Sequence, residues 1–184
     1  PVDRKTGVIG DFGVTVYLGN RQEIKEHLKR CMHINNELFD FIEIGRRFSD
    51  LYNFAEEIIA SQELTNEVTS STDPTGRDYG HTVPATNNNW TNEEKAIIKN
   101  GEVDWESVKG MINKKRVFIN ALEKTTFQPG MAVTLEPRLA IINNPNIPMG
   151  SFHTIAVIKQ DGTKELLTNF DEIFKITGMD YMLN

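Results

Sequence analysis

Three residues of the types that bind divalent metal ions stand out in the sequence: Asp11, His81 and Glu136. Asp11 lies in an apolar segment punctuated by glycines, where a ligand can approach the backbone closely. Two carboxylates and one imidazole form a suitable ligand set for Mn, Co, Fe or Zn. Residues far apart in a sequence can meet on one face of a sheet. The sequence therefore raises the hypothesis of a metal site made by these three side chains.

Each of the three residues also has a simpler interpretation. Asp11 can be a turn aspartate, and a lone histidine in a polar segment, such as His81, is most often a surface residue. Glu136 lies between Leu135 and Pro137 and can be an exposed residue at a strand end. If Glu136 is buried, its charge needs a cation, because an unpaired buried carboxylate is costly. The sequence alone leaves these alternatives open.

Apolar patterns predict the elements that must position these side chains. Residues 7–18 are rich in Val and Ile and contain glycines, which favours a strand with a bend or bulge. Apolar residues spaced by three and four over residues 24–42 predict a long helix that ends near Gly45. A second helix is expected with Ser49 as its N-cap and a buried face that extends to Ile59.

The order of the remaining patterns indicates an α+β fold, with strands in the last third of the chain. Pro137 predicts a strand end, an edge or a bulge within the first of these strands. Further elements are expected at residues 61–92 (a loop), 91–94 (a capping box that opens a short helix), 104–113 (a helix), 131–143, 153–158 and 163–167 (strands, the last two joined by a hairpin turn) and 171–174 (a helical turn).

Length and charge exclude several classes of protein. The chain has 184 residues, 26 acidic and 20 basic, with a net charge of −6, which argues against a nucleic-acid partner. No apolar stretch reaches the roughly 20 residues that span a bilayer, so no membrane partner is expected. Cys31 is the single cysteine; it excludes an internal disulfide and, on an apolar helix face, is expected to be packed. We expect one soluble, cytoplasmic domain over residues 1–184.

Several segments resemble one known family in the same order. Residues 128–137 resemble the PGM…EP strand of the methionine aminopeptidase and Xaa-Pro peptidase family, which has the creatinase or pita-bread fold. The matching segments are residues 11–16 (similar to the SDxTRT strand), 44–51 (the connection between paired helices), 80–81 (the start of the GHGIG element) and 153–168 (the closing hairpin). The resemblance implies a curved, mainly antiparallel sheet covered by helices on its outer face. It also implies a metal bound by Asp11, His81 and Glu136, and a peptide or protein N-terminus as partner.

The same alignment shows departures from the family. In the closing hairpin, Phe152 stands at the position of the family's bridging glutamate, and a phenylalanine cannot bind a metal. The first aspartate of the family falls before Pro1, with Asp3 as a stand-in at the wrong spacing, so the family's N-terminal portion is expected to be missing. A second histidine after His81 has no counterpart. Two carboxylates can balance one divalent ion, whereas two ions leave a charge of +2 uncompensated.

The sequence therefore supports two hypotheses about function. The first is a divergent metal-dependent aminopeptidase with a reduced site that holds one divalent ion (Mn, Co, Fe or Zn). The second is a non-catalytic module, with or without a metal, that binds peptides or proteins and keeps the peptidase fold without a working dinuclear site. Phe152 and the missing second histidine motivate the second hypothesis. The sequence leaves oligomerisation open under both.

Overall fold

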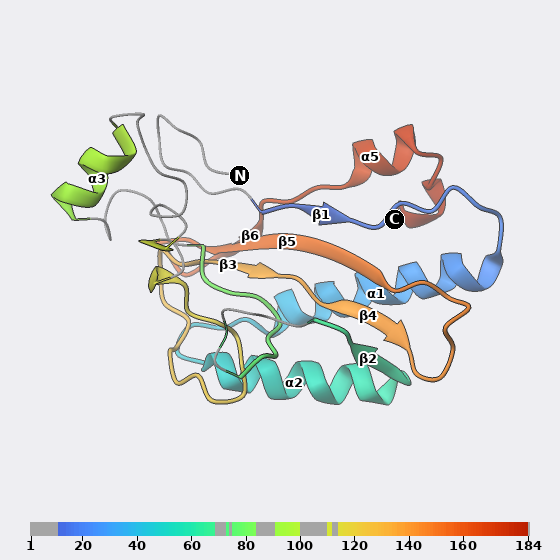
Figure 1. The fold of residues 1–184 in the computed structure, drawn as a ribbon, viewed down its shortest axis with the longest axis horizontal. Helices are drawn as coiled ribbons and strands as arrows, with labels where there is room; N and C mark the ends of the chain where they lie inside the picture. The colour runs from blue at the N-terminus through green and yellow to red at the C-terminus, as the bar shows by residue number, and fades with distance from the viewer. Residues whose placement is uncertain are drawn as a thin grey trace.

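A computed structural model describes residues 11–68, 73, 75–83, 91–99, 110–111 and 114–183. Within these residues the chain forms an open antiparallel sheet with helices packed against it (Figure 1), which confirms the predicted α+β class. The elements are β1 (Gly13–Val14), α1 (Gln22–Phe41), α2 (Phe48–Ser61), β2 (Leu64–Asn66), α3 (Asn92–Lys99), β3 (Ala132–Leu135), β4 (Arg138–Ile141), β5 (Gly150–Ile158), β6 (Lys164–Leu166), α5 (Asp171–Ile176) and the 3₁₀ helix η1 (Asp180–Met182).

Strand β5 is the centre of the six-stranded sheet. β1 and β6 pair with one edge of β5, β3 and β4 pair with the other, and β2 pairs with β4. β3 ends at Leu135 and β4 begins at Arg138, so the strand break that Pro137 predicts is confirmed. The hairpin between β5 and β6 is also confirmed, with Gly162 at a positive φ of 86° in its turn.

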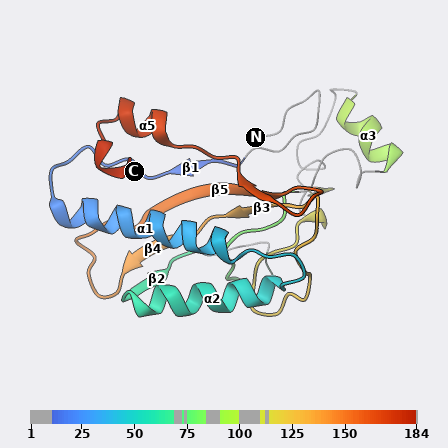
Figure 2. The same cartoon turned by 180° about the vertical axis from the view of Figure 1, so that it is seen from behind.

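Helix α1 lies against one face of the sheet. It passes behind β5 in Figure 1 and in front of it in Figure 2, which is the view from the opposite side. The predicted apolar stripe of α1 is buried against the sheet. The approach is close at Gly150, where an added Cβ would lie 2.7 Å from the Cys31 sulfur and 2.9 Å from a methyl carbon of Leu28.

Cys31 is buried in this interface, as its helical position predicts. Burial raises the pKa of its thiol to about 12. The thiol is therefore neutral at physiological pH and packs as a small apolar group.

Every second residue of β5 is buried, and this alternation separates the two faces of the sheet. Phe152 and Thr154 point to the face covered by α1, where the Asn35 side chain donates a hydrogen bond to the Phe152 carbonyl. His153 lies between them and therefore points to the opposite face. The candidate metal-binding residues lie on that opposite face.

Some predicted boundaries are wrong. Helix α2 begins at Phe48, and the N-cap is Arg47 instead of Ser49; the Asp50 carboxylate accepts the Arg47 N–H at 3.0 Å. Residues 64–66, predicted to lie in a loop, form β2 because they pair with β4. In the described part of residues 7–18, strand pairing is confined to β1.

Other predictions are confirmed or fall outside the described residues. The capping box is confirmed, because the Thr91 N–H donates to the Glu94 carboxylate at 2.7 Å and the Glu94 N–H donates to the Thr91 hydroxyl at 3.2 Å. Most of the helix predicted at 104–113, together with Asp3, lies outside the described residues. None of the helices in the described ranges is long and apolar enough to span a membrane.

Candidate metal centre

Asp11, His81 and Glu136 converge on one face of the sheet, and His153 joins them. The His81 Nε2 atom lies 3.6 Å from Asp11 Oδ2 and 3.4 Å from Glu136 Oε1. The His153 Nδ1 atom lies 3.5 Å from Asp11 Oδ1 and 3.4 Å from Glu136 Oε2. Each imidazole therefore faces one oxygen of each carboxylate.

The pairing of β3 with β5 places Glu136 next to His153. Leu135 lies opposite Thr154, and β4 continues in the same register from Arg138. Glu136 is the next residue along from Leu135, so it lies opposite His153. In an antiparallel sheet, directly opposed side chains share a face, with Cβ atoms about 4.5–5.5 Å apart.

The β1 side of β5 brings Asp11 to the same place. Gly13 lies opposite His153, and Asp11 precedes Gly13 by two residues, on the same side of the chain. Gly13 leaves space for the imidazole, because an added Cβ would lie 2.9 Å from the His153 Cγ atom. The glycine that the sequence indicates as a bend is thus also a contact surface for the His153 ring.

His81 comes from a short segment that lies alongside β3. Its backbone N–H donates to the Thr134 hydroxyl at 3.0 Å, and its carbonyl accepts the Thr134 N–H at 2.8 Å. The close approach requires Gly80, which has a φ of 143° and whose added Cβ would lie 2.0 Å from the Thr134 carbonyl oxygen. The His81 side chain is 5% exposed and packs edge-on against Phe118.

The second nitrogen of His81 fixes its tautomer. Nδ1 lies 2.9 Å from the Thr82 carbonyl oxygen, which can only accept, so Nδ1 carries the hydrogen. Nε2 is then the nitrogen that faces the two carboxylates, and in a neutral ring its lone pair is available to a cation placed between them. A histidine that donates its other N–H to a carbonyl is the usual arrangement for a metal ligand.

The two histidines also affect the protonation of Asp11. His153, and then His81, hold the pKa of Asp11 well below its usual range. Asp11 is therefore a carboxylate at neutral pH. Three of these four residues satisfy the geometry of a shared ion: ligand atoms of Asp11, Glu136 and His153 all lie within 4.8 Å of one another. Two carboxylates and two imidazoles fit one divalent cation in both charge and donor type.

His153 is not indicated by the sequence motifs, which assign Phe152 to this position. Phe152 is 1% exposed and packs in the core against the rings of Phe170 and Phe174. The expectation that an apolar side chain stands in the site is therefore wrong. The signal that could have indicated His153 is the alternation of apolar and polar residues along β5. Phe152 is apolar and His153 is polar, so the two side chains are expected on opposite faces of the sheet.

The sequence profile of metallopeptidase family M24 matches residues 3–159, which is most of the chain. The chain belongs to metallopeptidase family M24. The M24 match confirms the resemblance to the Xaa-Pro peptidase family that the motifs indicate. A search of curated proteins finds no match to this M24 chain.

Solved structures with the same fold are similar to this M24 chain over most of its length. They include prolidase from Pyrococcus horikoshii OT3 (16% identity, TM-score 0.55, 86% of this chain and 35% of that chain), Xaa-Pro dipeptidase from Bacillus anthracis (17%, 0.55, 87% and 35%) and dipeptidase PepE from Mycobacterium ulcerans (14%, 0.56, 87% and 33%). This M24 chain therefore spans about a third of the length of those proteins. At these identities the likeness shows the fold.

One further acidic group lies near the M24 cluster. Asp78 is 2% exposed, and burial, followed by the negative charge of Glu136, raises its pKa from 3.8 to about 6. Its carboxylate accepts the Gly80 N–H at 3.0 Å. Because the folded state holds this proton more tightly than the unfolded state, the free energy of unfolding falls as the pH rises from about 4 to 6.

We predict that Asp78→Asn stabilises the metal-free protein at neutral pH. The amide oxygen can still accept the Gly80 N–H, and the penalty for a buried negative charge disappears. In EDTA, the free energy of unfolding of the variant should be about 1–2 kcal/mol higher than that of the wild type at pH 7.5, and the two values should be equal near pH 4. Urea unfolding at both pH values measures the difference, and an equal difference at both would contradict it.

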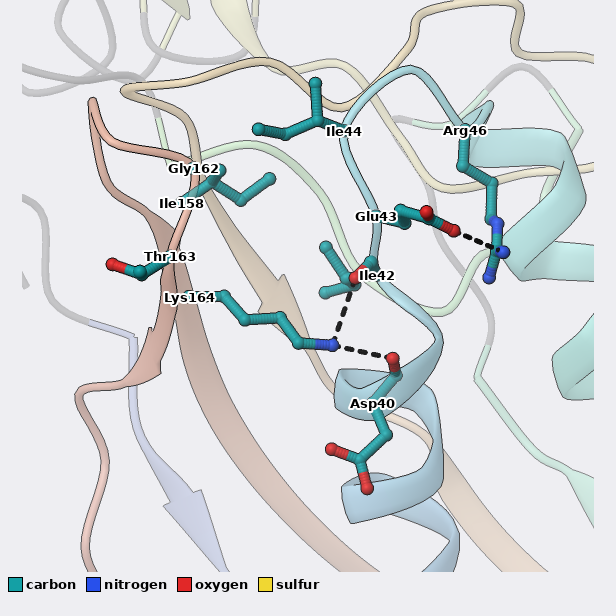
Figure 3. A pocket seen from close by; sticks show the side chains of 9 residues that line it. All are labelled: Asp40, Ile42, Glu43, Ile44, Arg46, Ile158, Gly162, Thr163 and Lys164. Atoms are coloured by element: carbon teal, nitrogen blue, oxygen red, sulfur yellow. Dashed lines mark hydrogen bonds and ion pairs between the residues drawn. The ribbon is translucent and has the colours of Figure 1, made fainter.

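A hollow lies between the C-terminal end of α1 and the β5–β6 turn (Figure 3). It has a volume of about 700 Å³. The cations that line it already have partners within the chain. The Lys164 ammonium donates to the carbonyls of Phe39, Asp40 and Ile42 at 2.8, 2.6 and 3.0 Å, and Arg46 pairs with Glu43 at 2.6 Å. Lys164 thus acts as a cap for α1.

We expect Lys164→Met to lower the free energy of unfolding by about 1–2 kcal/mol, because the end of α1 loses a cation that satisfies three carbonyls. Lys159→Met is the matched control on the same hairpin, since Lys159 is half exposed and pairs with Glu165. Its loss should be about 0.5 kcal/mol or less. Equal losses in chemical denaturation would contradict the capping role.

Proposed function

We propose that this chain acts on peptide N-termini as a divergent metal-dependent aminopeptidase of the Xaa-Pro or methionine type. Asp11, His81 and Glu136 would hold a single divalent ion. Membership of family M24 and the fold shared with prolidase and Xaa-Pro dipeptidase support the class of reaction. The observation that carries the proposal is the convergence of donors from separate parts of the chain within 3.4–3.6 Å contacts.

A divalent ion at this cluster would polarise the scissile carbonyl and lower the pKa of a bound water. The residues of the chain supply the charge and the orientation that binding of this ion requires. Asp11 and Glu136 supply two negative charges, and Thr82 holds the His81 ring with Nε2 toward them. Burial of His81 against Phe118 excludes water from that side. The low local dielectric that results strengthens the attraction between the carboxylates and a cation.

The test is release of the N-terminal residue from peptides that begin with Met or with Xaa-Pro. The protein is stripped with EDTA and reloaded with Mn²⁺ or Co²⁺, and products are followed by mass spectrometry. We expect release only after reloading, and none from Asp11→Asn. If the loaded protein binds these peptides in calorimetry but releases nothing, the non-catalytic binding module replaces the peptidase.

The structure removes one argument for that alternative. The sequence motivates the binding module by placing Phe152 where a metal ligand belongs, and the Phe152 side chain lies in the core instead. The segment that would carry a second histidine lies outside the described residues. The peptidase assay therefore decides between the two functions.

A further inference from the structure

His153 faces the two carboxylates with a nitrogen that has no hydrogen-bond partner among the described residues. We propose that His153 is a metal ligand through Nδ1, and that its imidazole together with the Asp11 and Glu136 carboxylates binds one borderline divalent ion, Zn²⁺, Co²⁺ or Fe²⁺, in preference to Mn²⁺ or Mg²⁺. This role deepens the proposed function and rests on it, because it requires a divalent ion at the cluster.

The His153 Nδ1 atom is buried and, within the described residues, makes no hydrogen bond, although it lies 3.5 Å from Asp11 and 3.4 Å from Glu136. These separations exceed the 2.7–3.2 Å of protein N–H···O hydrogen bonds. A buried polar atom without a partner costs about 1–3 kcal/mol. A cation shared with the carboxylates would give this atom a partner.

The spacing of the donors fits an ion shared by His153 and the carboxylates. Ions bound to nitrogen and carboxylate oxygen at about 2.0–2.2 Å hold their donors about 3–4 Å apart. The contacts of His153 with both carboxylates lie in that range, and donor atoms of Asp11, Glu136 and His153 all lie within 4.8 Å of one another. His81 contacts the other two carboxylate oxygens at 3.6 and 3.4 Å and does not belong to this group of three.

The backbone of the neighbouring strands holds the His153 ring in place. The register of β3 and β5 sets Glu136 directly opposite His153, and β1 sets Gly13 on its other side. The ring occupies the space that a side chain at Gly13 would fill, with the nearest ring atom 2.9 Å from an ideal Cβ. A side chain fixed in this way loses little conformational entropy when it binds an ion.

The donor types decide which ion fits. Two carboxylates neutralise one divalent cation, whereas a second cation would leave the cluster positively charged. Imidazole nitrogens favour Zn, Co and Fe, while Mn and Mg favour sites built from oxygens. In the group of Asp11, Glu136 and His153, the His153 imidazole is the nitrogen donor. Without it the group would hold oxygen donors alone, so His153 favours the borderline ions.

Nuclear magnetic resonance of the wild-type protein labelled with ¹⁵N-histidine tests this role directly. The chain has four histidines, so the signals of the individual rings can be followed one by one. When Zn²⁺ is added to EDTA-treated protein, we expect the His81 Nε2 and His153 Nδ1 signals to shift. His27, which is bonded to the Leu139 carbonyl in the core, and the exposed His33 should not respond. A shift of His81 with His153 unchanged would overturn the role of His153 and leave the proposed function intact. No zinc binding at all would overturn both.

Variants then test the metal preference by calorimetry and elemental analysis. We expect one Zn²⁺ per wild-type chain and an affinity for Zn²⁺ about tenfold lower or more in His153→Ala, with a smaller loss for Mn²⁺. His153→Glu should reverse the preference toward Mn²⁺, since it replaces a nitrogen by an oxygen donor. His33→Ala is the matched control and should bind as wild type does. Wild-type zinc affinity in His153→Ala, with the fold intact by circular dichroism, would contradict the inference.

Gly13→Ala gives an independent variant that keeps the histidine. The added methyl group would displace the His153 ring, so zinc affinity should fall in the same direction as in His153→Ala. Combining the two substitutions should cause little further loss, because both act on one ligand. Full additivity of the two losses would show that Gly13 affects the cluster by another route and that His153 does not bind the ion.

Discussion

The His81→Ala protein is expected to bind Co²⁺ or Zn²⁺ about 100-fold more weakly than the wild type, and to lose any metal-dependent release of N-terminal residues. Changes to residues that merely orient metal ligands cost 10–100-fold in affinity, and loss of the ligand should lie at or beyond the upper end. The His81 ring is also the best oriented of the donors, because the Thr82 carbonyl fixes its tautomer. Calorimetric titration of EDTA-treated protein measures the change.

Two controls separate metal binding from folding in this experiment. His81→Gln retains most of the buried volume and should also lose affinity, so that a cavity alone does not explain the result. His33→Ala removes a histidine whose side chain is 62% exposed and should leave affinity unchanged. If His81→Ala and His33→Ala bind metal equally well, then His81 is a buried structural residue and the metal site proposed at this cluster is wrong.

Gly80→Ala is expected to lower the free energy of unfolding by about 3 kcal/mol or more. Its φ of 143° is a conformation that side chains rarely adopt, and the added Cβ would lie 2.0 Å from the Thr134 carbonyl oxygen. Backbone strain at such a position costs about 1–3 kcal/mol, and overpacking adds a similar amount. The overlap is with backbone, so relief requires the His81 segment to move away from β3. Metal affinity should therefore fall together with stability.

Gly45→Ala is the matched control for the backbone term. Gly45 also has a positive φ, 86°, but no atom of the described part of the chain lies within 4 Å of its ideal Cβ. Its loss should be about 1 kcal/mol and should not affect metal binding. Thermal and urea unfolding of both variants gives the comparison. Similar losses in the two proteins would mean that Gly80 is needed for its conformation alone and that the contact with Thr134 can relax.

Local patterns were sufficient for the helices and the larger strands. The buried face of α1 matches the spacing of its apolar residues, and Pro137 ends a strand where its missing N–H predicts. The predictions for the N-cap of α2 and for residues 64–66 are wrong for different reasons. Helix α2 begins before Ser49 because the Arg47 N–H donates to the Asp50 carboxylate and makes Arg47 the N-cap. Strand β2 exists because β4 lies beside it. A propensity for strand at residues 64–66 is too weak to detect without that neighbour.

The sequence by itself indicated the types of donor and the residues Asp11, His81 and Glu136, which the fold brings within 3.4–3.6 Å contacts. It did so because carboxylates and imidazoles are residue types that bind divalent ions and because these three positions match ligand positions of the family that the motifs resemble. The tertiary structure alone decided which residue of β5 joins them. A shift of one residue in a strand exchanges its faces, and only the pairing of β5 with β1 and β3 sends Phe152 to the core and His153 to the carboxylates.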